Sequence, residues 1–408
     1  MMRILREVRK SGSGPVPWQV LALTSVFLLL PALFVADFEA PKLFSGEPAA
    51  AAESPSKGKQ VLDELVAKAK QEGELVATIQ SSWSKGLIQP LTDTFRKRFG
   101  LDIKVTVANV NSAQHFPVAI AETQAGAPAT YDVVQGDDAE TMQIVGAGAT
   151  QKVENWATLL AEINPLVRSG KVRPDEISRG PFQDHSFMFM ANVKQIIYNT
   201  RSISEKDLPR THRDLADAKY KGKFAQPPWT SHWEIAPVAF DKFDRNEWLD
   251  VVRRAGKNSG AVMGESGAVQ RVVLGEFAFA LAQDRYIRQI FAKDPKAPIA
   301  ARFFDDYNEL NQVYYSVRTR ARHPAAGTLW ALWMTTAESQ RIWQPSDLQA
   351  MPYGDSQLDR DFKQNIEKSK ARVIGFLDNE KTMDLLKWYR TDEGRKYLDA
   401  VARAIRGE

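Results

Sequence analysis

The first part of the chain alternates between helix-like and strand-like spacing of its apolar residues. Apolar residues three and four apart predict helices over residues 61–69 and 87–99, and short apolar runs predict strands at 75–79 and 103–107. A strand, a helix and a second strand in this order form a βαβ unit, which indicates a parallel sheet with a right-handed crossover. In such sheets, ligands bind beyond the carboxyl ends of the strands.

The same alternation continues along the chain. Further helices are predicted over residues 118–123, 142–145, 156–168, 246–255 and 268–273, and through the region after Pro324. Further strands are predicted at residues 133–134, 224–226, 277–282, 298–304 and 313–317, and a pair of strands is predicted at 186–191 and 195–199, with 191–194 between them. Recurring strand–loop–helix units predict an α/β fold.

One stretch, residues 260–286, combines a strand end, a short polar loop and a helix. The loop consists of Gly264, Glu265, Ser266 and Gly267, and apolar residues at helical spacing follow it. Free backbone N–H groups at such a helix start bind anions or polar ligands. An ordinary helix cap, with Ser266 as the N-cap residue, is the alternative interpretation.

Composition excludes several classes of protein. The chain has 408 residues, enough for two globular lobes, and its 44% hydrophobic and 25% charged residues are ordinary for a globular protein. It has no cysteine, which excludes disulfides, thiolate metal sites and cysteine nucleophiles.

The N-terminal region predicts export. Arg3, Arg6, Arg9 and Lys10 precede an apolar run at residues 18–36. This layout is typical of a secretory signal or of a single membrane anchor, and both interpretations of residues 1–36 stay open. Residues 37–60, rich in Pro, Ala and Gly, are expected to form a linker. The protein is thus expected in the periplasm, either released or retained at the inner membrane.

Net charge gives no sign of nucleic-acid binding. The chain carries a formal charge of +4, but residues 1–36 account for most of it, so the exported body is nearly neutral. A nucleic-acid partner is therefore not expected.

Two sequences imitate catalytic motifs without completing them. "HRDLADAK" resembles a kinase catalytic loop, but Lys219 stands where the metal-binding Asn belongs, so a solvated helix is expected. Residues 264–268 approach the nucleophile elbow G-x-S-x-G, but Ala268 replaces the last Gly. No phosphate-loop, dinucleotide or metalloprotease motif is present. Catalytic residues, cofactors and metal ligands are accordingly predicted to be absent.

Polar loops that follow predicted strands are the remaining candidate sites. They contain Ser81, Ser82 and Trp83; Asp137 and Asp138; and Trp229, Thr230 and Ser231. The aspartate pair could hydrogen-bond a ligand or could simply cap a helix.

Several segments, in order along residues 75–343, resemble the extracellular solute-binding proteins of ABC transporters, in the ferric-iron-binding branch. They are "LVATIQSSWSKGLIQPLTDTFRKRFGLDIKV", "YDVVQGDD", "IIYNT", "DLADAKYKGKFA", "AVQRVVLGEFAFALAQDRY" and "ARHPAAGTLWALWMTTAESQRIW". The resemblance implies a type II periplasmic-binding fold with two lobes, a hinge and a ligand cleft between the lobes. Lobe 1 is expected at residues 61–185, with 300–408 returning to it, and lobe 2 at 186–299. The expected partners are an ABC permease and a small-molecule ligand, and the protein is expected to be a monomer.

The chain departs from the iron-binding members at their metal ligands. Those members use a histidine in the first loop and a Tyr-Tyr pair, whereas this chain has Ser82 and Trp83 in that loop and Arg285-Tyr286 at the pair. A guanidinium repels Fe³⁺ and binds phosphate, phosphonate or carboxylate, so a small organic anion is the expected ligand. The candidate ligand-binding residues are Ser81, Ser82, Trp83, Asp137, Asp138, Trp229, Thr230, Ser231, Glu265, Ser266, Gly267, Arg285 and Tyr286.

Two alternatives to anion transport stay open. One is a ferric-iron-binding transport protein. The other is a membrane-anchored sensor or an exported enzyme built on the same lobes.

Overall fold

A mixed β-sheet of ten strands organises the described part of the chain. The structure is a computed structural model that describes residues 56–408, so the predicted export segment at 1–36 and most of the predicted linker lie outside the described residues. The strand order is β2-β1-β3-β9-β4-β7-β5-β6, with β10 paired to β9 and β8 paired to β4. In residues 56–408, no helix is long and apolar enough to cross a membrane.

The first lobe is built around the predicted βαβ unit. Strands β1 and β2 pair in parallel along their whole length, as the hydrophobic pattern predicted. Gly73 and Gly100 end the two helices in the left-handed conformation, which a residue without Cβ adopts at little cost. The elements are α1 (Lys57–Glu72), β1 (Glu74–Gln80), η1 (Lys85–Leu87), α2 (Ile88–Phe99), β2 (Lys104–Val110), α3 (Ser112–Gln124), β3 (Val133–Asp137) and α4 (Asp138–Gly146).

Helix α1 begins inside the segment expected to be a linker. Ser56 accepts a hydrogen bond from the backbone N–H of Lys59 at 3.2 Å and so caps the first turn. After α4 come α5 (Trp156–Ile163) and α6 (Pro165–Arg168), which meet at the interruption that Pro165 predicted.

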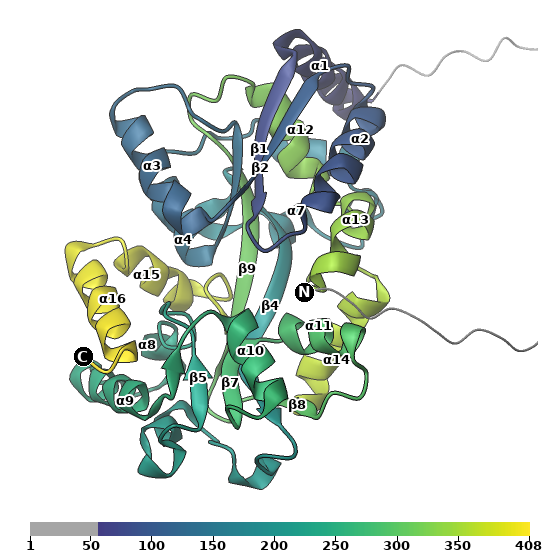
Figure 1. Cartoon of the computed structure of the whole chain (residues 1–408). Helices are drawn as coiled ribbons and strands as arrows, with labels where there is room; N and C mark the ends of the chain where they lie inside the picture. The colour runs from purple at the N-terminus through teal and green to yellow at the C-terminus, as the bar shows by residue number, and fades with distance from the viewer. Residues whose placement is uncertain (1–55) are drawn as a thin grey trace, which may run out of the picture. The chain divides into compact units, whose positions relative to one another are not determined.

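The predicted pair of strands at 186–191 and 195–199 is wrong, because these residues form one continuous strand, β4 (Ser186–Asn199). Its first half pairs antiparallel with β9 (Asn308–Val317), and its second half pairs with β7 (Phe279–Gln283) and β8 (Ile299–Arg302). β4 thereby runs through both lobes, beside β9, as Figure 1 shows.

The second lobe has its own parallel strands. β5 (Phe224–Gln226) pairs in parallel with β6 (Ala261–Val262) and with β7. Helix α10 (Glu265–Leu274) packs on β7 and β4. The other helices of this region are α8 (Ala236–Ala239), α9 (Arg245–Asn258) and α11 (Arg285–Lys293), whereas α7 (Pro174–Ile177) packs on α5 of the first lobe.

The "HRDLADAK" segment is not the solvated α-helix expected from the sequence. It forms two short 3₁₀ turns, η4 (His212–Ala216) and η5 (Ala218–Tyr220). His212 is buried, and its Nδ1 lies 2.9 Å from Asp306 Oδ1. Local caps also contribute, because Asp214 takes part in a capping box with Thr211 and the Asp217 side chain accepts a hydrogen bond from the backbone N–H of Lys219.

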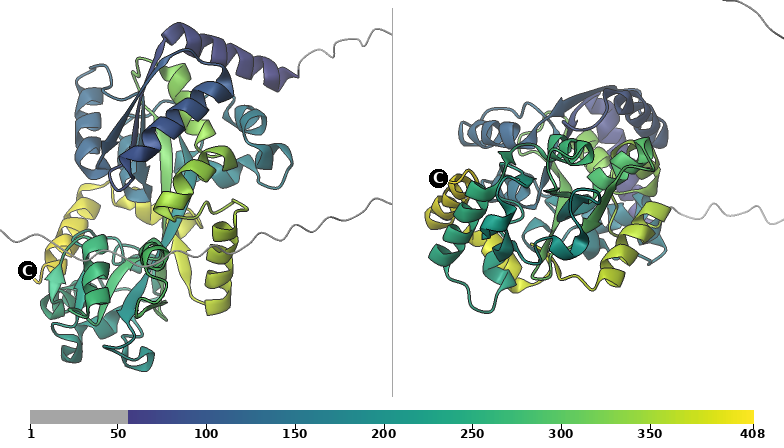
Figure 2. Two further views of the ribbon diagram at one scale, coloured as in Figure 1. Left: turned by 45° about the vertical axis from the view of Figure 1, so that its right-hand side comes forward. Right: turned by 60° about the horizontal axis from the view of Figure 1, so that its bottom comes forward.

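The C-terminal elements divide between the two lobes. Helix α12 (Pro324–Trp333) packs on α1, β1 and β3, and α13 (Ala337–Asp347) packs on α2. Helix α16 instead packs on α9, and Figure 2 shows the yellow C-terminal helices beside the teal ones of the second lobe. A Cβ on Gly256 of α9 would lie 2.3 Å from the backbone oxygen of Ala404, which shows how closely these helices approach.

The lobe boundaries expected from the sequence stay a prediction. The contacts of α16 favour assigning residues 357–408 to the second lobe, and we propose that division in place of a return of all of 300–408 to the first. The elements concerned are α14 (Gln357–Ser369), β10 (Val373–Gly375), α15 (Glu380–Trp388) and α16 (Asp392–Ile405).

Candidate ligand-binding site

A cavity of about 240 Å³ lies where elements of the two lobes meet. It is bordered by the residues that follow β1 and β2, by the first turns of α10 and α11, and by the middle of β4 and β9. The carboxyl ends of β1 and β2 therefore open onto it, as expected for parallel strands. Its walls are mostly polar and consist of Gln80, Ser81, Ser82, Val110, Asn111, Ser112, Gln135, Asn192, Trp229, Glu265, Gln283, Arg285, Tyr286, Asn311 and Gln349.

Arg285 is the cation of the cavity wall. Its Nη1 donates to Asp347 Oδ1 at 2.7 Å and to Ser82 Oγ at 3.4 Å, and its Nη2 donates to the Tyr286 hydroxyl at 2.8 Å. Its Nε is buried and has no hydrogen-bond partner among the described residues. Burial opposes the charge, but the interactions with Asp347, Tyr286 and Glu265 together outweigh burial and raise the pKa of Arg285. The guanidinium is therefore charged and keeps an unused donor.

Glu265 is the acid of the cavity wall and the first residue of α10. Its Oε1 lies 3.3 Å from Lys194 Nζ and accepts a 3.4 Å bond from Trp229 Nε1, while its Oε2 accepts a 3.3 Å bond from the backbone N–H of Gln283. Burial alone would raise the pKa of Glu265, but Lys194, His232 and Arg285 together reverse this and lower the pKa to about 2. Glu265 is thus an ionised carboxylate at a helix N-terminus, where negative charge is favoured.

Comparison with known proteins identifies the family. A profile of the family described as bacterial extracellular solute-binding protein matches residues 91–356, which is more than half of the chain. The chain belongs to this family. It is a periplasmic solute-binding component of an ABC transporter, which works with an ABC permease and is not an enzyme. A comparison with curated protein sequences found no match.

Solved structures with the same two-lobed fold cover most of this solute-binding protein. Iron-bound HitA from Pseudomonas aeruginosa is 19% identical, with a TM-score of 0.63, and the match covers 81% of this chain and 99% of that one. The ferric binding protein from Campylobacter jejuni is 17% identical, with a TM-score of 0.61 and coverage of 80% and 99%. AfuA from Actinobacillus pleuropneumoniae, with fructose-6-phosphate bound, is 16% identical, with a TM-score of 0.61 and coverage of 82% and 99%. At these identities the likeness shows the fold alone.

The structure brings together residues from three of the segments singled out in the sequence. The predicted residues that line the cavity are Ser81, Ser82, Trp229, Glu265, Arg285 and Tyr286. Trp229 is 42% exposed and presents a free aromatic surface. Arg285 was expected to be available to a ligand, but it already shares an ion pair with Asp347, which the sequence did not reveal.

Trp83, Ser266 and Gly267 do not line the cavity. Trp83 is buried and stacks on Trp343, with ring centroids 5.8 Å apart, so its ring belongs to the core. The alternative interpretation, in which Ser266 is the N-cap residue, is wrong, because α10 begins at Glu265 with Gly264 as its N-cap residue. Ser266 and Gly267 lie in the first turn, outside the cavity lining.

Asp137 follows the alternative interpretation, helix capping, whereas Asp138 binds residues of β9. The side chain of Asp137 accepts a 3.0 Å hydrogen bond from the backbone N–H of Glu140. The side chain of Glu140 in turn accepts a 3.1 Å hydrogen bond from the backbone N–H of Asp137. Asp138 is buried and accepts hydrogen bonds from the backbone N–H of Gln312 at 2.8 Å and from the Tyr314 hydroxyl at 3.1 Å. Neither aspartate lines the cavity.

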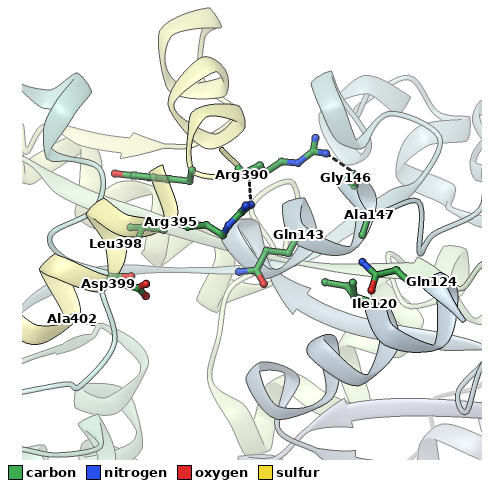
Figure 3. A pocket seen from close by; sticks show the side chains of 12 residues that line it. Ile120, Gln124, Gln143, Gly146, Ala147, Arg390, Arg395, Leu398, Asp399 and Ala402 are labelled. Atoms are coloured by element: carbon green, nitrogen blue, oxygen red, sulfur yellow. Dashed lines mark hydrogen bonds between the residues drawn. The ribbon is translucent and has the colours of Figure 1, made fainter. Parts of the chain in front are cut away.

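Thr230 and Ser231 lie off the cavity as well. The Thr230 hydroxyl donates to Glu234, and Ser231 is buried with no hydrogen-bond partner for its Oγ among the described residues. Thr230 instead borders a second, larger cavity of about 680 Å³, drawn in Figure 3. There, Gln143 and Ala147 of the first lobe face Arg395 and Leu398 of the C-terminal helices.

Sequence reasoning missed the amide side chains that make up much of the cavity wall. Asn192 lies in the middle of β4, and Asn311 and Gln349 lie on β9 and after α13. The one available signal was the run "FMFMANVKQIIYN", in which Asn192, Lys194 and Gln195 interrupt a mostly apolar strand. Polar residues in a fully buried strand need hydrogen-bond partners, and other residues of the cavity wall, Gln349 and Glu265, provide them.

A group of buried and half-buried carboxylates lies near the cavity but does not line it. Asp138, Glu234 and Glu309 are buried, and Asp137 and Glu140 are half-buried. Burial, reinforced by the charge of Asp137, raises the pKa of Glu234 to about 7 and that of Glu140 to about 8. Among residues 56–408, no three His, Asp or Glu side chains are arranged to hold a metal ion.

Proposed function

We propose that this solute-binding protein captures a small organic anion, namely a phosphate ester, a phosphonate or a carboxylate, when its two lobes close on it. The observation that carries the proposal is the meeting of Ser82 and Arg285, which belong to different lobes and whose Oγ and Nη1 atoms lie 3.4 Å apart. A guanidinium binds the oxygens of carboxylates and phosphates, and a serine hydroxyl adds a further donor. Both groups line the cavity.

Ferric iron is the second candidate ligand. Tyr286 lines the cavity, and proteins that bind iron share the fold. Arg285 argues against it, because its guanidinium lies 4.6 Å from the centre of the Tyr286 ring, where its positive charge would repel Fe³⁺. Burial raises the pKa of Tyr286 to about 12, which favours the neutral phenol over the phenolate that binds Fe³⁺. Among the proteins that share the fold, one structure contains fructose-6-phosphate, a phosphate ester.

Thermal unfolding with candidate ligands tests the proposal. Phosphate esters, phosphonates and carboxylates are each compared with Fe³⁺, and a ligand at a hundred times its dissociation constant should stabilise the protein by about 2.7 kcal/mol. Arg285→Gln should abolish the stabilisation by anions. The matched control is Arg271→Gln, whose side chain is half-exposed on α10 and pairs with Glu276 at 3.6 Å. Stabilisation by Fe³⁺ alone would replace the anion with the metal as the ligand.

We propose that the protein reaches the periplasm through residues 18–36 and acts there as a monomer. The apolar run preceded by Arg3, Arg6, Arg9 and Lys10 supports export, although it lies outside the described residues. Mass spectrometry of the exported protein will show whether its N-terminus begins after this run or includes it. Light scattering of the same sample measures the oligomeric state.

A further inference from the structure

Besides Ser82 and Arg285, the cavity has an acceptor side, which is formed by Asn192, Gln283 and Glu265. Asn192 Oδ1 and Gln283 Oε1 are both buried and have no hydrogen-bond partner among the described residues, and both residues line the cavity. Asn192 as a whole is 1% exposed. A buried oxygen without a partner costs about 1–3 kcal/mol, so a bound molecule that donates to it is favoured.

Glu265 adds a third acceptor on this side. A carboxylate has about four lone-pair sites. Lys194 and Trp229 approach its Oε1, whereas only the backbone N–H of Gln283 is bonded to its Oε2. Its second oxygen therefore keeps a place for a donor from a ligand.

The charges around the acceptor side favour a ligand that donates from hydroxyl groups over one that donates from an ammonium group. An ammonium group of a ligand would be the third cation in a small space, because Lys194 Nζ already lies 3.3 Å from Glu265 and Arg285 lines the same cavity. Each of these cations already has its own carboxylate partner, so a further positive charge would be left without one. Hydroxyl groups donate hydrogen bonds without adding charge. The exposed ring of Trp229 offers an apolar surface to the carbon atoms that carry them.

We propose that the ligand carries hydroxyl groups on the carbon skeleton that bears its anionic group, and that Glu265, Asn192 and Gln283 accept hydrogen bonds from these hydroxyls. The inference rests on the proposed function, because the anionic group is what places the skeleton. Lys194 is a positioning residue in this arrangement. It touches no ligand, but it keeps Glu265 ionised and pointed at the cavity.

Three phosphate monoesters of similar size test the proposal by titration calorimetry: glycerol 3-phosphate, propyl phosphate and phosphoethanolamine. Glycerol 3-phosphate should bind at least about tenfold more tightly than propyl phosphate, because a site built to bond hydroxyls rejects an analogue that lacks them. It should also bind more tightly than phosphoethanolamine. Glycerate and propionate form the same comparison for a carboxylate group. Equal affinities within each pair, or a preference for phosphoethanolamine, would overturn the inference while leaving the proposed function standing. If none of the five probes binds, the proposed function fails, and this inference fails with it.

Variants separate a binding role from a structural one. Gln283→Leu removes an acceptor without breaking any existing side-chain bond, so it should fold normally and weaken glycerol 3-phosphate binding about fivefold to tenfold while leaving propyl phosphate unchanged. Glu265→Gln should reduce the same discrimination, but it also leaves Lys194 unpaired, so Gln283→Leu is the decisive variant. The control is Glu276→Gln, an exposed acid at the end of α10. If Gln283→Leu weakens both esters equally, the proposed acceptor role of Gln283 is overturned.

Discussion

Arg285 and Asp347 form an ion pair of 2.7 Å in which both side chains are buried. Asp347 ends α13, which packs on α2 of the first lobe, whereas Arg285 begins α11 of the second. Two further hydrogen bonds join α11 to the C-terminal end of α13. Arg288 Nε donates to Leu348 O at 2.8 Å, and Gln289 Nε2 donates to Asp347 O at 3.1 Å. An arriving anion therefore meets a guanidinium that is already held in place and already partly neutralised.

Asp347→Asn should have opposite effects on stability and on binding. Removing one partner of a buried pair leaves an uncompensated charge and should lower the free energy of unfolding by about 3 kcal/mol. The same uncompensated charge on Arg285 should strengthen anion binding by about tenfold, a change of about 1.4 kcal/mol. Urea denaturation and calorimetry measure the two effects. Asp361→Asn, on the exposed face of α14, is the control. Weaker anion binding in Asp347→Asn would show that the carboxylate helps to place the ligand.

The two tryptophans of the polar loops should respond differently to replacement by alanine. Trp83 is 4% exposed and packs edge-on to Phe189 as well as stacking on Trp343, so Trp83→Ala should cost about 3–5 kcal/mol of stability. Trp229 is 42% exposed and makes one hydrogen bond, to Glu265 at 3.4 Å. Trp229→Ala should cost under about 1.5 kcal/mol of stability and should weaken ligand binding. Thermal unfolding and calorimetry on both variants check the contrast, and equal losses of stability would contradict it.

Stability should fall as the pH rises from about 5 to 8. Glu234 and Glu140 have pKa values raised from 4.5 to about 7 and about 8, so the folded protein binds more protons than the unfolded chain over this range. A state that binds more protons loses stability as the pH increases, here by several kcal/mol. Chemical denaturation at a series of pH values measures this slope. Glu234→Gln should flatten the slope, whereas Glu247→Gln, on the exposed surface of α9, should leave it unchanged.

Glu265 should make stability depend on pH in the opposite direction, because it stabilises the fold less as the pH falls. Its pKa is lowered to about 2, so the stability that it contributes is present above about pH 4.5 and is lost as the pH falls toward 2. The pH at which stability is greatest should therefore lie near 5, between the two effects. A maximum above pH 7 would mean that Glu234 and Glu140 are ionised in the folded protein.

The βαβ unit could be predicted because local signals decide it. Glycines end α1 and α2, and apolar residues at periods of 3.6 and 2 mark the helices and strands between them. The same reasoning gave a wrong result for β4. A strand that is buried at every residue shows no alternation of apolar and polar positions, so its few polar residues resemble a break between two strands. Asn192 and Lys194 are tolerated there only because distant residues, Gln349 and Glu265, bond to them.

The candidate site was predictable where loops follow strands and unpredictable where partners come from far along the chain. Ser82 and Trp229 stood out as polar or aromatic residues at loop positions, and Arg285 stood out through the family resemblance; all three line the cavity. Asp347 was not recognisable, because its role depends on an ion pair across 62 positions of sequence. A single sequence carries no signal for such a pairing.

Arg390 should hold the lobes together on the side of the larger cavity. It lies between α15 and α16, and its Nη2 donates to the carbonyl oxygen of Gly146 at 2.7 Å, where the last carbonyls of α4 carry partial negative charge (Figure 3). The bond is exposed, so Arg390→Ala should change the free energy of unfolding by less than about 1 kcal/mol. Because the bond joins α4 of the first lobe to the C-terminal helices, its loss should favour the open form and weaken ligand binding about twofold to threefold.

A second variant tests the same contact from the other side. A Cβ on Gly146 would lie 2.0 Å from Arg390 Cζ, so Gly146→Ala should displace the guanidinium and give the same result. Calorimetry and small-angle scattering measure affinity and opening, with Lys396→Ala on the exposed face of α16 as the control. Unchanged affinity in both variants would show that this contact plays no part in closure.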